Sequence, residues 1–467
     1  MAAGSWRSSG SGLRSDEMAD GLLRSMGYPR VMCLVALCAG ILLMVFPASG
    51  TAKEPQVAAS AASGIYAFDL AVGNRGYAVM AWSVESADSG RGRYRAKVFT
   101  RTRLPGRAEF GPRRFIGRAS SDFIAAEIGG NGTTVVAWSG TNGYLTYSVR
   151  TPRLGWSGVN TVAGARVKRA RISVATDGTV AMASLRTRSF DNLPSRVLGT
   201  VWRGRSERQH RWRVLSTDGE TIGFYLDVVA GQGTRATVVW SGACESRGSN
   251  PASSWISMNS SHSTPARRVR GSGCVARGID LQADRYGNQY MYLGAQLAIR
   301  KAGSPSMAVV KVGPPGVNKG GGQLSVSENG LATLIVRSNK VKSGLMYGTS
   351  RRGGPLSDLK ELDNVRRALS GRRDVLLDVA PLPGGRLAMF WAEIWPPPPS
   401  GGQWRGLSVK VWHPGKVFTQ PDYSELPPNY LPFPSGLATG STGDSIAWWN
   451  LTPETDEFGN TVFWWQP

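Results

Sequence analysis

Residues 68–82 read FDLAVGNRGYAVMAW, and this stretch decides the fold. A short apolar segment leads to a turn that contains Gly73 and Gly76, and a second apolar segment ends at Trp82. Glycine in such a turn supplies the positive φ that tight hairpins need, so the stretch predicts two antiparallel strands. The second segment is apolar without interruption, which predicts a strand buried on both faces.

The same pattern returns along the rest of the chain, with intervals of 43 to 58 residues between its ends. The further copies are FIAAEIGGNGTTVVAW (123–138), RISVATDGTVAMAS (171–184), LDVVAGQGTRATVVW (226–240), GIDLQADRYGNQYMYL (278–293), LSVSENGLATLIV (324–336), LLDVAPLPGGRLAMFW (376–391) and SGLATGSTGDSIAWW (435–449). Between the hairpins there is room for two more strands, such as 94–102 and 407–413.

Four strands in about 50 residues, repeated in series, are typical of β-propeller blades, whereas β-sandwich domains need about 100 residues. We therefore predict an all-β fold, a single β-propeller of about eight four-stranded blades over residues 65–467. Seven blades is the alternative if the fifth or sixth hairpin is degenerate. The last copy has only one further strand, near 461–466, so a strand near 56–60 is expected to complete that blade.

The hairpin motif Gly-x-Ala-x-Val-x-Trp resembles that of secreted bacterial β-propeller repeat proteins, which are functionally uncharacterised. The resemblance covers Ile65 to Pro467 and implies architecture, not activity. The Gly-His and Trp-Asp pair of WD40 repeats and the Asp-box of sialidases do not occur in the sequence. The tryptophans that end the repeats are expected to pack between adjacent blades.

The N-terminal region predicts export. Residues 31–46 read VMCLVALCAGILLMVF without a charge, Arg24 and Arg30 precede them, and small residues follow up to Ala52. This order of basic, apolar and small residues predicts a secretory signal within residues 1–52, followed by a short linker at 53–64. An uncleaved anchor is the alternative, and it is the one route by which the protein would contact a membrane. We expect a secreted protein or one on the extracellular face of the envelope.

The composition shows a basic protein with little material for metal chemistry. Lys and Arg number 55 against 32 Asp and Glu, a formal charge of +23, and the chain has 3 His and 4 Cys. Few histidines argue against a His-rich metal site, so we predict no metal and no cofactor. Beyond residue 52 the cysteines are Cys244 and Cys274, which we expect to form a disulfide outside the cell. Two free buried thiols are the alternative.

Four acidic residues recur in the first strand of a hairpin: Asp69, Asp227, Asp280 and Asp378. The first strand of a propeller blade usually lines the central channel. Carboxylates gathered there could bind a cation such as calcium or a sugar hydroxyl, and a pair of them could hydrolyse a glycoside. The alternative, which we favour, is that each carboxylate accepts hydrogen bonds from backbone N–H groups at a strand edge or blade junction.

Two other groups of residues are candidates for ligand binding. Arg95, Lys97 and Arg101 fall at strand period and predict a basic face for polyanions, with a solvated outer strand as the alternative. Two proline-rich loops, 395–404 and 421–434, offer the aromatic rings of Trp395, Trp404, Tyr430 and Phe433 to a carbohydrate or peptide. Rigid connectors are the alternative for these loops.

We predict from these features a binding or scaffold module for an extracellular polysaccharide, an anionic polymer or an envelope protein. We expect a monomer without specific nucleic-acid recognition. The competing hypothesis is a propeller glycosidase or polysaccharide lyase that uses the channel carboxylates. The sequence contains no Gly-x-Ser-x-Gly, His-Glu-x-x-His, phosphate-loop or Cys-x-x-Cys motif, so we lean away from an enzyme.

Overall fold

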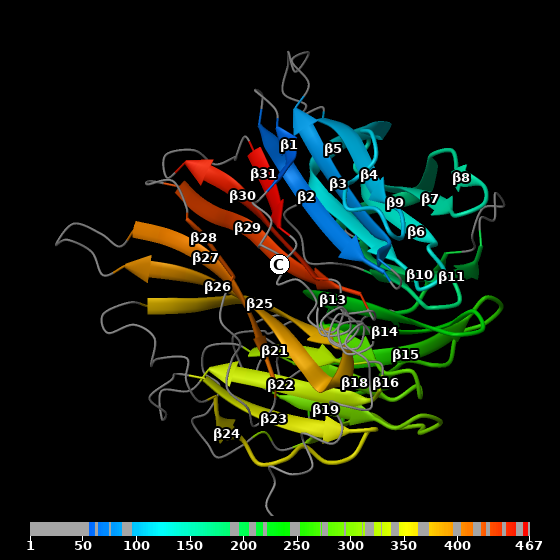
Figure 1. Cartoon of the computed structure of the whole chain (residues 1–467). Helices are drawn as coiled ribbons and strands as arrows, with labels where there is room; N and C mark the ends of the chain where they lie inside the picture. Colours follow the sequence, from blue (N-terminus) through cyan, green and yellow to red (C-terminus); the bar gives the residue numbers. More distant parts are fainter. Residues whose placement is uncertain are drawn as a thin grey trace, which may run out of the picture. The chain divides into compact units, whose positions relative to one another are not determined.

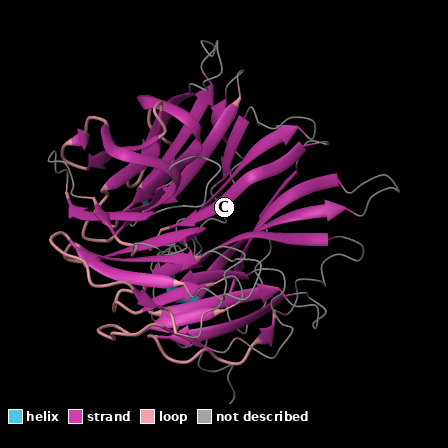
Figure 2. Cartoon of the chain, turned by 180° about the vertical axis from the view of Figure 1, so that it is seen from behind, coloured by secondary structure: helices cyan, strands magenta, loops and turns pink. Residues whose placement is uncertain are grey.

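Hairpins of this kind can only bury their apolar faces against one another, and the structure is accordingly built from strands. The computed structural model describes residues 56–60, 64–73, 76–85, 96–186, 196–204, 212–217, 222–242, 253–270, 272, 279–293, 296–310, 312, 322–327, 329–337, 345–362, 373–395, 403–413, 422–425, 430–440, 445–453 and 461–465. They belong to one unit, Glu54–Pro467. Most of them lie in strands and none in an α-helix (Figure 2). The prediction of an all-β fold is confirmed.

Four sheets in the described part of the chain each contain four consecutive antiparallel strands. The first of these sheets contains β13 (Ile222–Gly231), β14 (Arg235–Gly242), β15 (Ser254–Asn259) and β16 (Arg267–Arg268). The second contains β17 (Asp280–Ala283), β18 (Gln289–Tyr292), β19 (Leu297–Arg300) and β20 (Ala308–Val310). The third contains β21 (Gly322–Val326), β22 (Leu331–Arg337), β23 (Leu345–Arg351) and β24 (Lys360–Glu361). The fourth contains β25 (Arg373–Leu382), β26 (Arg386–Trp395), β27 (Gln403–Trp412) and β28 (Asp422–Glu425).

The N-terminal half forms one eleven-stranded sheet, because two long strands are shared between consecutive runs of strands. The strands are β2 (Ile65–Val72), β3 (Ala78–Glu85), β4 (Ala96–Arg103), β5 (Arg114–Ile128), β6 (Thr134–Gly140), β7 (Tyr144–Thr151), β8 (Gly155–Trp156), β9 (Asn160–Val174), β10 (Thr179–Arg186), β11 (Arg196–Arg203) and β12 (Arg213–Val214). The first half of β5 pairs with β4 and its second half pairs with β6. Strand β9 is divided in the same way between β7 and β10.

The two ends of the described chain meet in the remaining sheet. Its order is β1 (Gln56–Ser60), β31 (Thr461–Trp465), β30 (Ser445–Pro453) and β29 (Tyr430–Thr439), so the blue β1 lies beside the red β31 (Figure 1). The predicted completion of the last repeat by a strand at 56–60 is confirmed by the pairing of β1 with β31.

We call β2, β13, β17, β21, β25, β29 and the second halves of β5 and β9 the opening strands, because each begins a run of four strands. The opening strands contact one another in chain order, and the last of them, β29, also contacts β2.

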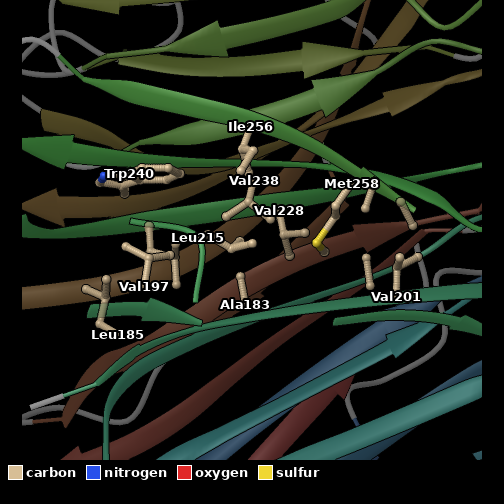
Figure 3. Close-up of a cluster of buried hydrophobic side chains, with 14 of the residues drawn as sticks. Ala183, Leu185, Val197, Val201, Leu215, Val228, Val238, Trp240, Ile256 and Met258 are labelled. Atoms are coloured by element: carbon tan, nitrogen blue, oxygen red, sulfur yellow. The ribbon is translucent and has the colours of Figure 1, made fainter. Parts of the chain in front are cut away.

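Each hydrophobic cluster is formed by two consecutive runs of strands. Trp240 and Val238 of β14 pack against Leu185 of β10 and Val197 of β11 in one such cluster (Figure 3). The repeat-ending tryptophans Trp82, Trp138, Trp240, Trp391 and Trp449 are all buried. Strand β6 is buried along its full length, as its uninterrupted apolar sequence predicts. The predicted packing of these rings between neighbouring repeats is therefore confirmed.

The turns of the hairpins use the chemistry that their sequences indicate. Gly132 follows Asn131 with φ 81°, and Gly178 follows Asp177 with φ 82°. At Asp177 the carboxylate accepts a hydrogen bond from the backbone N–H of Thr179 and a second from that of Gly233, in the next hairpin turn. Thus the hairpin turn at Asp177 connects two neighbouring sheets as well as the two strands of its own hairpin.

Candidate functional site

The predicted acids lie on opening strands, at positions that reach solvent. Asp69 is on β2, Asp227 on β13, Asp280 on β17 and Asp378 on β25, and all four are partly exposed. The residue that follows each of them, such as Leu70, is buried. This alternation means that the acids share the accessible side of the opening strands, while the intervening residues fill the core.

Three of these carboxylates join one opening strand to the next. Asp69 accepts a hydrogen bond from the backbone N–H of Leu70 at 2.9 Å and another, 57 residues away, from that of Ala126 at 2.8 Å. The same two bonds recur at Asp227 with Val228 and Leu281, and at Asp378 with Val379 and Leu437. The interpretation that the acids bind backbone N–H groups at blade junctions is thus confirmed for these three.

On β9 and β17 other polar side chains make the same kind of connection between opening strands. Ser173 on β9 accepts a hydrogen bond from the backbone N–H of Ala230 at 3.0 Å. Gln282 on β17 accepts from the N–H of Val326 and donates to the carbonyl of Leu324, both at 2.8 Å. The accessible side of the opening strands is therefore largely occupied by structural hydrogen bonds.

Asp280 and Glu127 differ from these connecting groups. The Asp280 carboxylate accepts hydrogen bonds from the Gln282 amide, at 3.2 Å to each oxygen. Burial, with added repulsion from Asp227 and Asp378, raises the pKa of Asp280 to about 7. Burial, with repulsion from Asp69 and Asp227, raises the pKa of Glu127 to about 8.

The repulsion that raises the pKa of Asp280 and Glu127 comes from carboxylates on other opening strands. The guanidinium of the exposed Arg171 on β9 lowers the pKa of Asp69, Glu127, Asp227 and Asp280 against the effect of burial. The sequence argument missed Glu127 and Arg171, although both fall on the accessible side of the strand according to its two-residue period. In the described ranges no three acidic, histidine or cysteine side chains are grouped as metal ligands.

The structure corrects the bounds of the two predicted proline-rich loops. Trp395 ends β26 and Trp404 lies near the start of β27, which pairs with β26, so both belong to strands. Strand β28 lies inside the predicted loop 421–434, and β29 begins at Tyr430 and contains Phe433. Prolines are accommodated there because the pairing of β29 with β30 shifts register between Pro432 and Ser435. The side chains of these four aromatic residues lie outside the described part of the structure.

The predicted basic face is described only in part. Lys97 on β4 is exposed and Arg101 is half-buried, and the Arg101 Nε has no hydrogen-bond partner among the described residues. Arg103, which follows on the same face, is buried, with its Nε donating to the carbonyl of Gly76. Arg95, Cys244, Cys274 and the predicted signal at 31–46 lie outside the described residues. The described part of the chain contains no helix that could cross a bilayer.

A pocket of about 890 Å³ opens on the sheet of β13–β16, at the edge where the hairpin turns lie. Its walls come from three runs of strands: the end of β9, the strands β13 to β15, and the turn between β17 and β18 with the end of β19. This volume lies within the range of small-ligand sites. The sequence argument missed the pocket, because its walls come from segments that are far apart in the chain.

The charges around the pocket are mostly positive. Arg235, Arg285 and Arg300 line it together with His262, and Asp284 is the one acid among its lining residues. Asp284 is buried and its oxygens accept four hydrogen bonds, from the backbone N–H groups of Tyr286 and Asn288, the Asn288 amide and the Tyr290 hydroxyl. Its acceptor capacity is therefore occupied by its own hairpin, the turn after β17 together with Tyr290 of β18.

Arg300 is held in place by the pocket wall. Its Nε donates to the carbonyl of Ser304 at 2.9 Å, its Nη1 donates to Gln289 at 3.1 Å, and its guanidinium lies 4.7 Å from the centre of the Trp255 ring. Burial, and then the neighbouring charge of Arg267, lower the pKa of Arg300. Both effects disfavour the positive charge of Arg300 itself, so an anion placed beside the guanidinium would offset them.

No protein-family model and no curated protein matches the chain. Among solved structures, it is similar to the β-propeller domain of the Trilobed protease from Pyrococcus furiosus, with 9% identity and a TM-score of 0.43 over 88% of this chain and 96% of that chain. It is similar to the BP39L lectin from Burkholderia pseudomallei, with 12% identity and a TM-score of 0.41 over 86% and 98%. It is also similar to the NanB sialidase from Streptococcus pneumoniae, with 10% identity and a TM-score of 0.34 over 91% of this chain and 71% of that chain.

Proposed function

We propose that this protein is an exported β-propeller that binds an acidic saccharide in the pocket on the β13–β16 sheet. The observation that supports this proposal is the charge of the pocket: three arginines line it, and its one acid is fully hydrogen-bonded within its own hairpin. Carboxylate or sulfate groups on a sugar chain are the extracellular anions that match such donors.

We also propose that the runs of strands are eight blades of a closed ring. The contact of β29 with β2 and the pairing of β1 with β31 support closure by the two ends of the chain. In this arrangement the carboxylates of the opening strands surround the axis, and the pocket lies on one rim.

Binding is favoured over glycoside hydrolysis by the state of the axial carboxylates. A hydrolytic pair needs one carboxyl to donate a proton and another to act as a nucleophile or base. Asp69, Asp227 and Asp378 each use both oxygens on backbone N–H groups, so they are committed to structure. Asp280 and Glu127 would have to act without them.

Calorimetric titration of the purified protein with two matched sugars tests the proposal. The ligands are an oligogalacturonate and the neutral oligogalactoside of the same length. We expect the acidic oligosaccharide to bind at least tenfold more tightly, because a hydrogen bond to a charged group contributes roughly 1.5–3 kcal/mol. Equal affinity for the two sugars would contradict the proposal.

The variant Arg235→Gln places the site. Arg235 is exposed, lines the pocket and has no ion-pair partner among the described residues. Its substitution is expected to weaken oligogalacturonate binding about tenfold. The control variant Arg114→Gln removes one positive charge from an exposed residue at the start of β5, which does not line the pocket. It should change the affinity less than twofold. Equal losses in the two variants would show that only net charge matters.

A further inference from the structure

At the rim of the pocket two arginines converge on one exposed tyrosine. Tyr286 lies in the turn between β17 and β18, Arg285 precedes it, and Arg352 comes from the turn that follows β23 in the next sheet. The guanidinium carbons of Arg285 and Arg352 lie 4.9 and 4.7 Å from the centre of the Tyr286 ring. Their Nη2 atoms donate to the Tyr286 hydroxyl at 2.8 and 3.0 Å. We call these three residues the clamp.

The backbone around the clamp is specialised to hold it. Arg352 has φ 49°, a left-handed conformation that non-glycine residues adopt rarely and at an energetic cost. Its N–H donates to the carbonyl of Gly330 at 2.7 Å. A Cβ atom on Gly330 would lie 3.1 Å from the Arg352 side chain and 3.3 Å from the Tyr286 ring, so glycine leaves the room that the clamp occupies.

The hydrogen-bonding character of the clamp selects its ligand. Guanidinium groups donate and never accept. The Tyr286 oxygen already accepts two N–H groups, which leaves its own proton to be donated. The hydrogen bond from Arg285, supported by the charges of both arginines, lowers the pKa of Tyr286, which makes its hydroxyl a stronger donor. The clamp is therefore a cluster of donors, and a neutral sugar hydroxyl, which must also donate, fits it poorly.

We propose that the clamp Arg285–Tyr286–Arg352 is the subsite that recognises the oxyanion substituent of the saccharide, a carboxylate or a sulfate. Arg285 and Tyr286 also line the pocket, so a sugar bound there would extend its charged group toward Arg352. This inference rests on the proposed function and adds to it a residue from the neighbouring sheet.

The test measures the affinity of Arg352→Gln for three oligosaccharides of equal length: an oligogalacturonate, a sulfated oligogalactoside and the neutral oligogalactoside. We expect at least a tenfold loss for the acidic sugar that the clamp recognises and less than a twofold change for the neutral one. A loss confined to the uronate identifies a carboxylate subsite, and one confined to the sulfated sugar identifies a sulfate subsite.

Two further variants separate recognition from folding and from net charge. Arg351→Gln removes an exposed charge one residue away and should bind like the wild type. Tyr286→Phe keeps a ring beneath the guanidinium groups and removes the donated proton, so we expect about a fivefold loss with an unchanged melting temperature.

Two results would overturn the clamp. One is an equal loss for Arg351→Gln and Arg352→Gln, and the other is wild-type affinity in both Arg352→Gln and Tyr286→Phe. If Arg235→Gln still weakens oligogalacturonate binding in that second case, the proposed function stands and only the clamp is wrong. If the wild-type protein binds neither acidic sugar, the proposed function fails and the clamp fails with it.

Discussion

The substitution Gly440→Ala tests whether the two ends of the fold meet. Gly440 directly follows β29, and a Cβ atom there would lie 2.5 Å from the carbonyl oxygen of Gly73 and 3.2 Å from the Val72 side chain, at the end of β2. The 2.5 Å contact is with backbone, so a strand has to move. The same relation exists between two opening strands of the eleven-stranded sheet, β5 and β9, where a Cβ on Gly129 would lie 2.4 Å from the carbonyl oxygen of Ala175.

The expected change in the free energy of unfolding of Gly440→Ala follows from two opposing effects. Overpacking of this kind costs about 1–3 kcal/mol, and the smaller conformational freedom of alanine in the unfolded chain returns about 0.4–1 kcal/mol. We expect a net loss of about 1–2 kcal/mol. For a unit of roughly 400 residues, an unfolding entropy near 2.1 cal/mol/K per residue converts this into about 1–2 °C. Replicate differential scanning calorimetry of the purified protein resolves a shift of that size.

Two controls make the result decisive. Gly158→Ala meets no atom within 4 Å and should leave the melting temperature unchanged or slightly higher. Gly129→Ala should destabilise the protein whether or not the ring closes, because Gly129 and Ala175 belong to consecutive runs of strands. One result would refute the closed ring, because it would mean that β29 does not lie against β2. In that result Gly440→Ala has the same melting temperature as Gly158→Ala, while Gly129→Ala has a lower one.

Four further predictions concern the carboxyl groups of the opening strands. Asp280→Asn should stabilise the protein at pH 8 by on the order of 2 kcal/mol, because it removes a half-buried charge that neighbouring carboxylates repel. Asp378→Asn should be less stable than Asp280→Asn in urea unfolding, since it leaves the N–H of Leu437 or Val379 unpaired at a cost of about 1–3 kcal/mol; the reverse order would contradict the assigned hydrogen bonds. Folding raises the pKa of Asp378 to about 6, of Asp280 to about 7 and of Glu127 to about 8, so the folded state binds more protons than the unfolded state between about pH 4 and these values, and the contribution of the three groups to stability falls as the pH rises from about 4 to about 8. The melting temperature should thus be higher at pH 5 than at pH 8.5, and Glu127→Gln should flatten the upper part of that profile, whereas an unchanged profile in Glu127→Gln would count against its raised pKa.

The repeat was readable from sequence because its signals are local. Turns such as Asn131-Gly132 need positive φ, and an apolar run such as that at 135–138 needs burial on both faces, so neighbouring residues are enough to predict each hairpin. The boundaries near Tyr430 were predicted wrongly because prolines usually indicate a loop. Here the chain continues as β29 through a shift in register, which depends on the pairing partner β30.

For the candidate site residues, too, the sequence predicted local features but not the contacts between sheets. The repeat placed Asp69 and its counterparts in the first strand of a hairpin, and the structure agrees, with the four acids on the accessible side of the opening strands. It could not show that the second oxygen of Asp69 binds Ala126, because that bond depends on how one sheet lies against the next. The two-residue period of a strand, applied to the second repeat, would have found Glu127.

By itself, the sequence determined the strands, the turns and the repeat, since hydrogen bonding and burial within a hairpin are settled by residues a few positions apart. Only the tertiary structure decided which charges are committed and which remain for a ligand. Asp69 and Asp378 are used by a neighbouring strand, whereas Arg352 and Tyr286, 66 residues apart, meet at the rim of the pocket. The physical reason is that a side chain's partners depend on distances across the sheets, and sequence separation says little about those distances.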